Sequence, residues 1–208
     1  MAELGAGVSL RGCRPHLHRR RAALDLAIAG FEARLALVAD PDWERPTPCD
    51  GWTVADLVKH LVGGGLMSEM LLDGASSQDA MVTLFNLDLQ GDLRAAFVDA
   101  RDRQAVAFAR PGAEDITCHH PMRDMPASQF IWMRVRDTAV HTWDLARSIG
   151  ADERLDDDLM ATIWSQVEPV APLLAGSGMF GSGASGELTD DASMQARVLD
   201  ALGRRPSV

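Results

Sequence analysis

The sequence is short of cysteine, of positive charge and of long apolar runs. Its three cysteines, Cys13, Cys49 and Cys118, are far apart and form no CxxC pair. This pattern excludes a disulfide framework and is typical of the reducing cytoplasm. The formal net charge of −10 argues against a nucleic-acid partner, which would need a basic surface. No apolar stretch approaches the roughly 18–20 residues that span a bilayer, so we expect no membrane partner either.

The chain is long enough for one domain with a sizeable core. Residues 1–19 lead into a basic cluster, Arg19 to Arg21, and contain no clean apolar segment before a small-residue cleavage site. We therefore expect a poorly ordered leader rather than a signal peptide, with an early helix turn as the alternative. The single domain is expected over residues 20–208.

Helical periodicity dominates, convincing strand alternation is scarce, and internal repeats are absent. The expected helices cover residues 20–39, 53–73, 91–109, 127–149 and 155–174, with a short one at 191–203. The proline-containing stretch 111–128 is expected to be a long connection, in which DITCHH is a weak strand candidate. The pattern predicts an all-α four-helix bundle with an additional short C-terminal helix. In such a bundle, polar sites are built from inward-pointing side chains of facing helices.

The first candidate site residue is His60, in the helix that Thr53 can cap with Asp56 three residues on. On a helical wheel His60 lies about 120° from the middle of the apolar stripe, which favours a flanking or surface histidine. Against this, Gly63 and Gly64 lie in mid-helix, where each costs about 1 kcal/mol relative to alanine. That cost is easier to understand if a backbone or a ligand approaches closely there.

The second candidate is the pair Asp137 and His141, which lie four apart and therefore on one helix face. Imidazole plus carboxylate at this spacing suits a first-row metal such as zinc, nickel or iron. The alternative is a salt-bridged solvent face formed with the neighbouring charged residues Arg134, Asp144 and Arg147. From the residues alone, the solvent face is favoured.

Two other groups contain potentially reactive side chains. His119 and His120 beside Cys118 form a competing cluster, for which we favour a plain surface position. Cys49 could be a reactive thiol near a helix N-terminus, where its pKa would fall. A small buried apolar residue is the favoured interpretation of Cys49.

Three segments, PTPCDGWTVADLVKHLVGG (46–64), AVHTWDLARSIG (139–150) and DASMQARVLDALGRRP (191–206), resemble the DinB-like superfamily. The similarity is to the branch related to the metal-binding N-terminal domain of mycothiol-dependent maleylpyruvate isomerase. The resemblance implies a four-helix bundle with one metal site at its open end, whose ligands would be His60, Asp137 and His141. Zinc is the expected ion and nickel the next, because three N/O ligands leave one open position. Asp56 could hydrogen-bond the nitrogen of the His60 ring that does not bind the metal, or serve only as an acidic residue in the first turn of the helix.

The same resemblance implies a transferase or isomerase that uses mycothiol or a similar small thiol on a small-molecule electrophile. Two departures bear on this expectation. Asp137 is shorter than the isomerase's glutamate, and the printed sequence ends at Val208, before a second domain of the isomerase kind. Maleylpyruvate isomerisation is therefore not expected. The alternatives are a non-catalytic small-molecule binding protein and a structural dimerisation module; a homodimer through helix faces is plausible.

Overall fold

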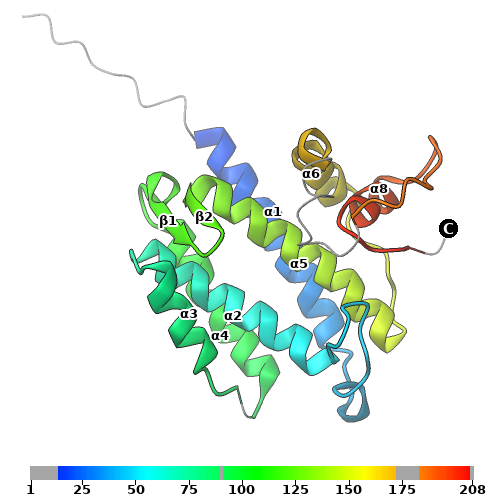
Figure 1. Ribbon diagram of the computed structural model, residues 1–208, viewed down its shortest axis with the longest axis horizontal. Coiled ribbons are helices and arrows are strands. Elements are labelled where there is room, and N and C mark those ends of the chain that lie inside the picture. Colours follow the sequence, from blue (N-terminus) through cyan, green and yellow to red (C-terminus); the bar gives the residue numbers. More distant parts are fainter. Residues whose placement is uncertain (1–13, 90, 172–182, 207–208) are drawn as a thin grey trace, which may run out of the picture.

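The computed structural model describes residues 14–89, 91–171 and 183–206 (Figure 1). Four long helices form the body of the protein: α1 (Arg14–Leu35), α2 (Val54–Leu72), α4 (Leu93–Ala109) and α5 (Ala127–Ile149). α1 packs along α5, α2 packs along α4, and α2 also contacts α5. The predicted all-α four-helix bundle is therefore confirmed.

The boundaries of the two N-terminal long helices differ in how well they were predicted. α2 begins as expected, because the Thr53 hydroxyl accepts from the Asp56 N–H and the Asp56 carboxylate accepts from the Thr53 N–H. α1 begins at Arg14, inside the segment that was expected to be a leader. The rest of that predicted leader, residues 1–13, lies outside the described residues.

Two short helices lie beside the bundle on the side of α1 and α5 (Figure 1). They are α6 (Asp157–Val167) and α8 (Met194–Ala201), which pack against each other. The additional C-terminal helix is thus confirmed, and the Ser193 hydroxyl caps it by accepting from the Ala196 N–H. α6 is shorter than the predicted helix because a 3-10 turn, Glu168–Val170, follows it directly.

The structure corrects two connections. A further helix, α3 (Ser77–Phe85), begins at the Ser76 cap and lies in a stretch where no helix was expected. Within 111–128, β1 (Thr117–His120) and β2 (Arg123–Pro126) pair in an antiparallel hairpin. β1 confirms the strand candidate in DITCHH, whereas β2 lies where only a loop was expected. These strands are too short for alternation to be detected in the sequence.

The hairpin also decides the position of its reactive residues. Cys118 is fully buried opposite the buried Met125, so its predicted surface position was wrong. Burial raises the pKa of the Cys118 thiol to about 11. His119, in contrast, is exposed and pairs with Asp124, as a surface histidine would.

α5 carries several charged and polar side chains that are buried. Arg134, His141 and Asp144 each expose less than a tenth of their surface. The solvent-face interpretation of this helix was therefore wrong. None of the described helices combines the length and apolarity needed to cross a membrane.

Candidate metal centre

The turn before α2 forms one wall of the site. Thr47 bonds the backbone of Cys49 and Trp52 through its hydroxyl, and Gly51 adopts a positive φ of 77° that the tight turn requires. The Trp52 ring therefore lies 5.0 Å from the His60 ring and 5.9 Å from the His141 ring, measured between centroids. The turn thus brings an aromatic wall and one thiol to the facing surfaces of α2 and α5.

His60, Asp137 and His141 converge between α2 and α5. Asp137 Oδ1 lies 3.1 Å from His60 Nε2 and 3.4 Å from His141 Nε2. One potential ligand atom from each residue lies within 4.8 Å of the other two. Zinc bonds of about 2.0–2.1 Å in a tetrahedral arrangement separate neighbouring ligand atoms by about 3.3 Å. The spacing of these three side chains therefore fits a divalent ion.

The three side chains differ in their exposure to solvent. The exposed fraction is 39% for His60, 27% for Asp137 and 9% for His141. The helical wheel correctly placed His60 away from the core, but the side chain faces a cavity between helices rather than bulk solvent. One side of the trio is therefore accessible to a small molecule.

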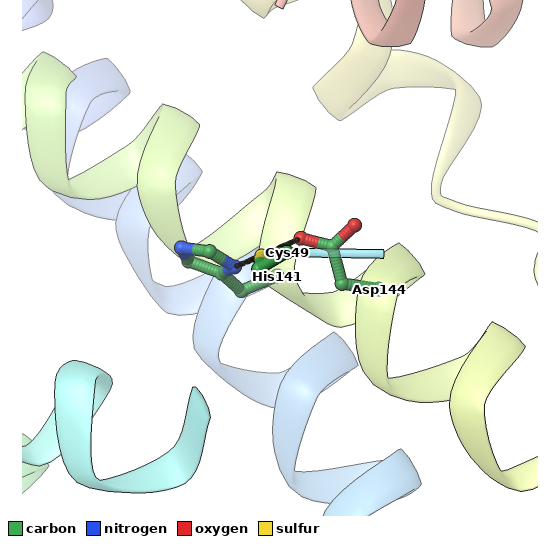
Figure 2. A group of neighbouring side chains, drawn as sticks. All are labelled: Cys49, His141 and Asp144. Atoms are coloured by element: carbon green, nitrogen blue, oxygen red, sulfur yellow. Dashed lines mark hydrogen bonds and ion pairs between the residues drawn. The ribbon is translucent and has the colours of Figure 1, made fainter. Parts of the chain in front are cut away.

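Asp144 holds the other nitrogen of the His141 ring. Its Oδ2 lies 2.9 Å from His141 Nδ1, and Figure 2 shows the second ring nitrogen pointing away from this contact. A proton on Nδ1 leaves the Nε2 lone pair directed at Asp137 and His60. This carboxylate–histidine contact is the arrangement that orients imidazole ligands in metal sites.

Arg204, in the segment after α8, closes the Asp144 side. Its Nε lies 2.9 Å from Asp144 Oδ1, and its Nη2 lies 2.6 Å from Asp144 Oδ2 and 3.2 Å from Cys49 Sγ. Cys49 is thus half-buried within a polar cluster, not the plain apolar residue that was favoured. Cys49, His141 and Asp144 form a second group with metal-ligand spacing (Figure 2). The Arg204 guanidinium already neutralises that group, which disfavours a metal cation there.

Arg134 fixes the second oxygen of Asp137. Its Nη1 donates to Asp137 Oδ2 at 2.6 Å and its Nε donates to Gln104 Oε1 at 3.0 Å. A Cβ at Gly64 would overlap the guanidinium, so this glycine leaves the space that Arg134 occupies. The close approach inferred from the mid-helix glycines is therefore real at Gly64, and its cause is a side chain from α5.

These contacts set the protonation of the site. Burial opposes the charge of Asp137, but hydrogen bonds with His141 and His60 and the Arg134 charge hold its pKa well below the usual value. Burial likewise opposes the charge of His141, but hydrogen bonds with Asp137, Asp144 and Cys49 raise its pKa well above the usual value. A proton therefore competes with any metal ion for His141.

A cavity of about 1250 Å³ opens beside the trio and includes His60 and Asp137 in its lining. Its walls include methionine, leucine and aromatic side chains from α2, α3, α5 and the hairpin. His120 also lines it, and burial together with the Arg134 and Arg123 charges lowers the pKa of that histidine. His120 is therefore neutral at neutral pH and can accept a proton, a role that its predicted surface position concealed.

The Asp56 carboxylate is engaged at the start of α2. It accepts from the Thr53 N–H at 3.0 Å and from the Thr53 hydroxyl at 2.7 Å, as a helix-start acid does. The carboxylate that does bond a candidate metal-binding histidine through its other ring nitrogen is Asp144, which contacts His141 Nδ1. Asp144 was named only as part of a solvent face, and its position three residues after His141 was the available signal.

The sequence matches one protein-family profile and two relatives of known sequence. The sequence profile of the mycothiol maleylpyruvate isomerase N-terminal domain matches residues 24–146. Uncharacterized proteins from two strains of Mycobacterium tuberculosis are each 32% identical over 133 residues. The matched region is 62% of this chain and 66% of each relative, slightly less than two thirds of their length.

Two crystal structures of the mycothiol-dependent maleylpyruvate isomerase, one of them of a mutant, share the fold. Each superposes with a TM-score of 0.59 at 20% identity, covering 78% of this chain and 74% of the isomerase chain. At this identity the similarity establishes the common architecture alone.

Proposed function

Because the chain belongs to the mycothiol maleylpyruvate isomerase N-terminal domain family, we propose that it is a divalent-metal-dependent enzyme that uses a small thiol. The thiol would be mycothiol or a similar molecule, and the reaction a transfer to, or isomerisation of, a small electrophile. Zinc is the first candidate ion, because two imidazoles and a carboxylate suit it, and nickel is the second.

One observation carries the proposal: three ligand-type side chains converge at metal-ligand spacing on the edge of a cavity. Asp137 Oδ1 is 3.1 Å from His60 Nε2 and 3.4 Å from His141 Nε2. The cavity side of this trio has no fourth protein ligand among the described residues. An open fourth position is typical of catalytic rather than structural zinc sites.

Each residue of the site would have a separate role. His60, Asp137 and His141 would hold the ion, while Asp144 keeps the His141 proton on Nδ1 and Arg134 fixes the direction of the Asp137 carboxylate. A bound divalent ion supplies Lewis acidity, which lowers the pKa of a coordinated water or thiol. The apolar walls would exclude water from the reacting groups, and neutral His120 could take up a proton.

Elemental analysis of the tag-free protein beside His141→Ala tests the proposal. We expect about one zinc or nickel ion per chain in the wild type and a loss of that ion in the variant. His119→Ala is the matched control, because His119 is an exposed histidine that pairs with Asp124 outside the trio. Absence of metal from the wild type after zinc addition, or an unchanged metal content in His141→Ala, would contradict the site.

The large apolar cavity also supports a second candidate, a non-catalytic protein that binds or sequesters a small molecule. Thiol consumption by the metal-loaded protein, measured with mycothiol and a generic electrophile, separates the two. An enzyme turns over many equivalents of thiol, whereas a binding protein saturates without turnover. The homodimer predicted from the sequence stays a prediction.

A further inference from the structure

Arg136 is a cationic side chain in the wall of the cavity without a counter-charge. It lines the cavity together with His60 and Asp137, and its Nε is buried without a hydrogen-bond partner. Among the described residues, no carboxylate forms an ion pair with its guanidinium. Burial lowers the pKa of Arg136, but an arginine keeps its charge in a protein, so the group is a half-buried cation that lacks an anionic partner among the described residues.

The two arginines that contact the carboxylates of the metal centre are, in contrast, paired. Arg134 pairs with Asp137 at 2.6 Å, and Arg204 pairs with Asp144 at 2.6 Å. The whole chain has a formal charge of −10, so acidic partners are abundant. An unpaired, half-buried arginine in such a protein needs an explanation, and an anionic ligand in the cavity provides one.

The cavity wall indicates the rest of the ligand. Apolar side chains contribute most of its lining, including Met67, Met81, Leu84, Leu87, Leu89 and Met133. Flexible methionines adapt to ligands of varied shape. A volume of about 1250 Å³ exceeds what a very small polar substrate would fill.

We propose that Arg136 is a specificity-determining residue that binds the carboxylate of a small organic acid whose apolar body lies along this wall. The acid would be the electrophilic substrate of the proposed enzyme, so this assignment rests on the proposed function for the identity of the ligand. The anion contact itself involves Arg136 and not the three candidate metal ligands.

Calorimetric titration of the metal-free protein with octanoate and with octanamide tests this assignment. Removing metal prevents the probe carboxylate from binding an ion, and the two probes differ only in charge and hydrogen bonding. We expect octanoate to bind the wild type about tenfold more tightly than octanamide, as one charge-assisted contact would give. In Arg136→Gln the octanoate affinity should fall about tenfold while the octanamide affinity stays unchanged.

Two further variants separate a direct contact from general charge and from misfolding. Arg136→Lys keeps the cation and should retain part of the preference for octanoate. Arg123→Gln removes another cation of the cavity wall whose guanidinium is already bonded to Gln129, and should leave the preference intact. Equal binding of both probes by the wild type, binding of neither, or equal weakening of both in Arg136→Gln would overturn the assignment. Because the titration uses metal-free protein, these outcomes are independent of whether the trio binds metal.

Discussion

The two nitrogens of the His141 ring face similar kinds of side chain, but only the Nε2 side is open to the cavity. On the Nε2 side lie Asp137, His60 and the open cavity. On the Nδ1 side lie Asp144, Cys49 and the guanidinium of Arg204. Both sides offer three groups at metal-ligand spacing, so spacing alone does not separate them.

Charge compensation separates the two sides. Arg204 bonds both oxygens of the fully buried Asp144, which leaves no carboxylate oxygen there without a cationic partner. Arg134 bonds only Oδ2 of Asp137, and Oδ1 is left to the two histidines. A divalent ion would thus replace protons on the Nε2 side but would have to displace an arginine on the Nδ1 side. This comparison teaches that the Nδ1 side orients the ring and that the Nε2 side is the one suited to bind an ion.

Exchange of Asp144 for asparagine is expected to have the largest effect on this comparison. Asp144→Asn keeps the shape but removes the charge that holds the Nδ1 proton, so zinc affinity should fall about 10- to 100-fold. Competition with a chromophoric zinc chelator measures the affinity. Cys49→Ala is the matched change, because Cys49 makes only a long, uncharged contact of 3.8 Å with the same nitrogen, against 2.9 Å for Asp144, and it should change the affinity far less. If Cys49→Ala lost as much affinity as Asp144→Asn, the ion would lie on the Nδ1 side and the comparison would be reversed.

The stability of the metal-free protein and the stabilisation added by zinc should depend on pH with opposite signs. The folded pKa of His141 is raised, so its protonation stabilises the metal-free protein fully below the unfolded value of about 6.5. That stabilisation is lost as the pH rises from about 6.5 through the folded pKa. Zinc requires the neutral ring, so zinc affinity should rise by up to about tenfold per pH unit over the same window.

Melting temperatures at several pH values above 6.5, with and without zinc, measure both trends. The metal-free melting temperature should fall with pH while the increase caused by zinc grows. The depressed pKa values of Asp137 and Asp144 act in a lower window, because their stabilisation is lost only as the pH falls below about 4. The His141→Ala variant should show neither trend above pH 6.5. A zinc effect that does not change with pH would rule out competition between the ion and the His141 proton.

The parts of the fold that depend on local chemistry could be predicted from the sequence. The capping box of Thr53 and Asp56 and the turn before it fixed the start of α2, and Gly150 ends α5 with a positive φ of 69°. The spacing of Asp137 and His141 placed both on one face of α5. Their convergence with His60, however, came from the family resemblance, because the helical wheel by itself favoured a surface position for His60.

The parts that depend on contacts between distant segments could not be predicted. Arg204 is 60 residues from Asp144, and no local pattern links the two. The strands of the hairpin are too short to show alternation, so β1 was only a weak strand candidate, β2 was missed, and the burial of Cys118 was concealed. The mid-helix glycines gave a correct indication of close approach but did not identify the approaching group.

Neighbouring glycine substitutions sharpen the last point and should have the smallest effect. In Gly63→Ala the new Cβ lies 3.8 Å from a Leu84 methyl, an ordinary contact, so the helix should gain about 1 kcal/mol of stability and zinc affinity should not change.

In Gly64→Ala the new Cβ overlaps the Arg134 guanidinium, which must move and release Asp137 Oδ2. We expect zinc affinity to fall by up to about tenfold, as for loss of a group that orients a ligand, while the protein remains folded. Thermal melts and the chelator competition measure the two quantities separately. If both variants changed stability alone, Arg134 would be a packing residue that does not orient the carboxylate on the Nε2 side.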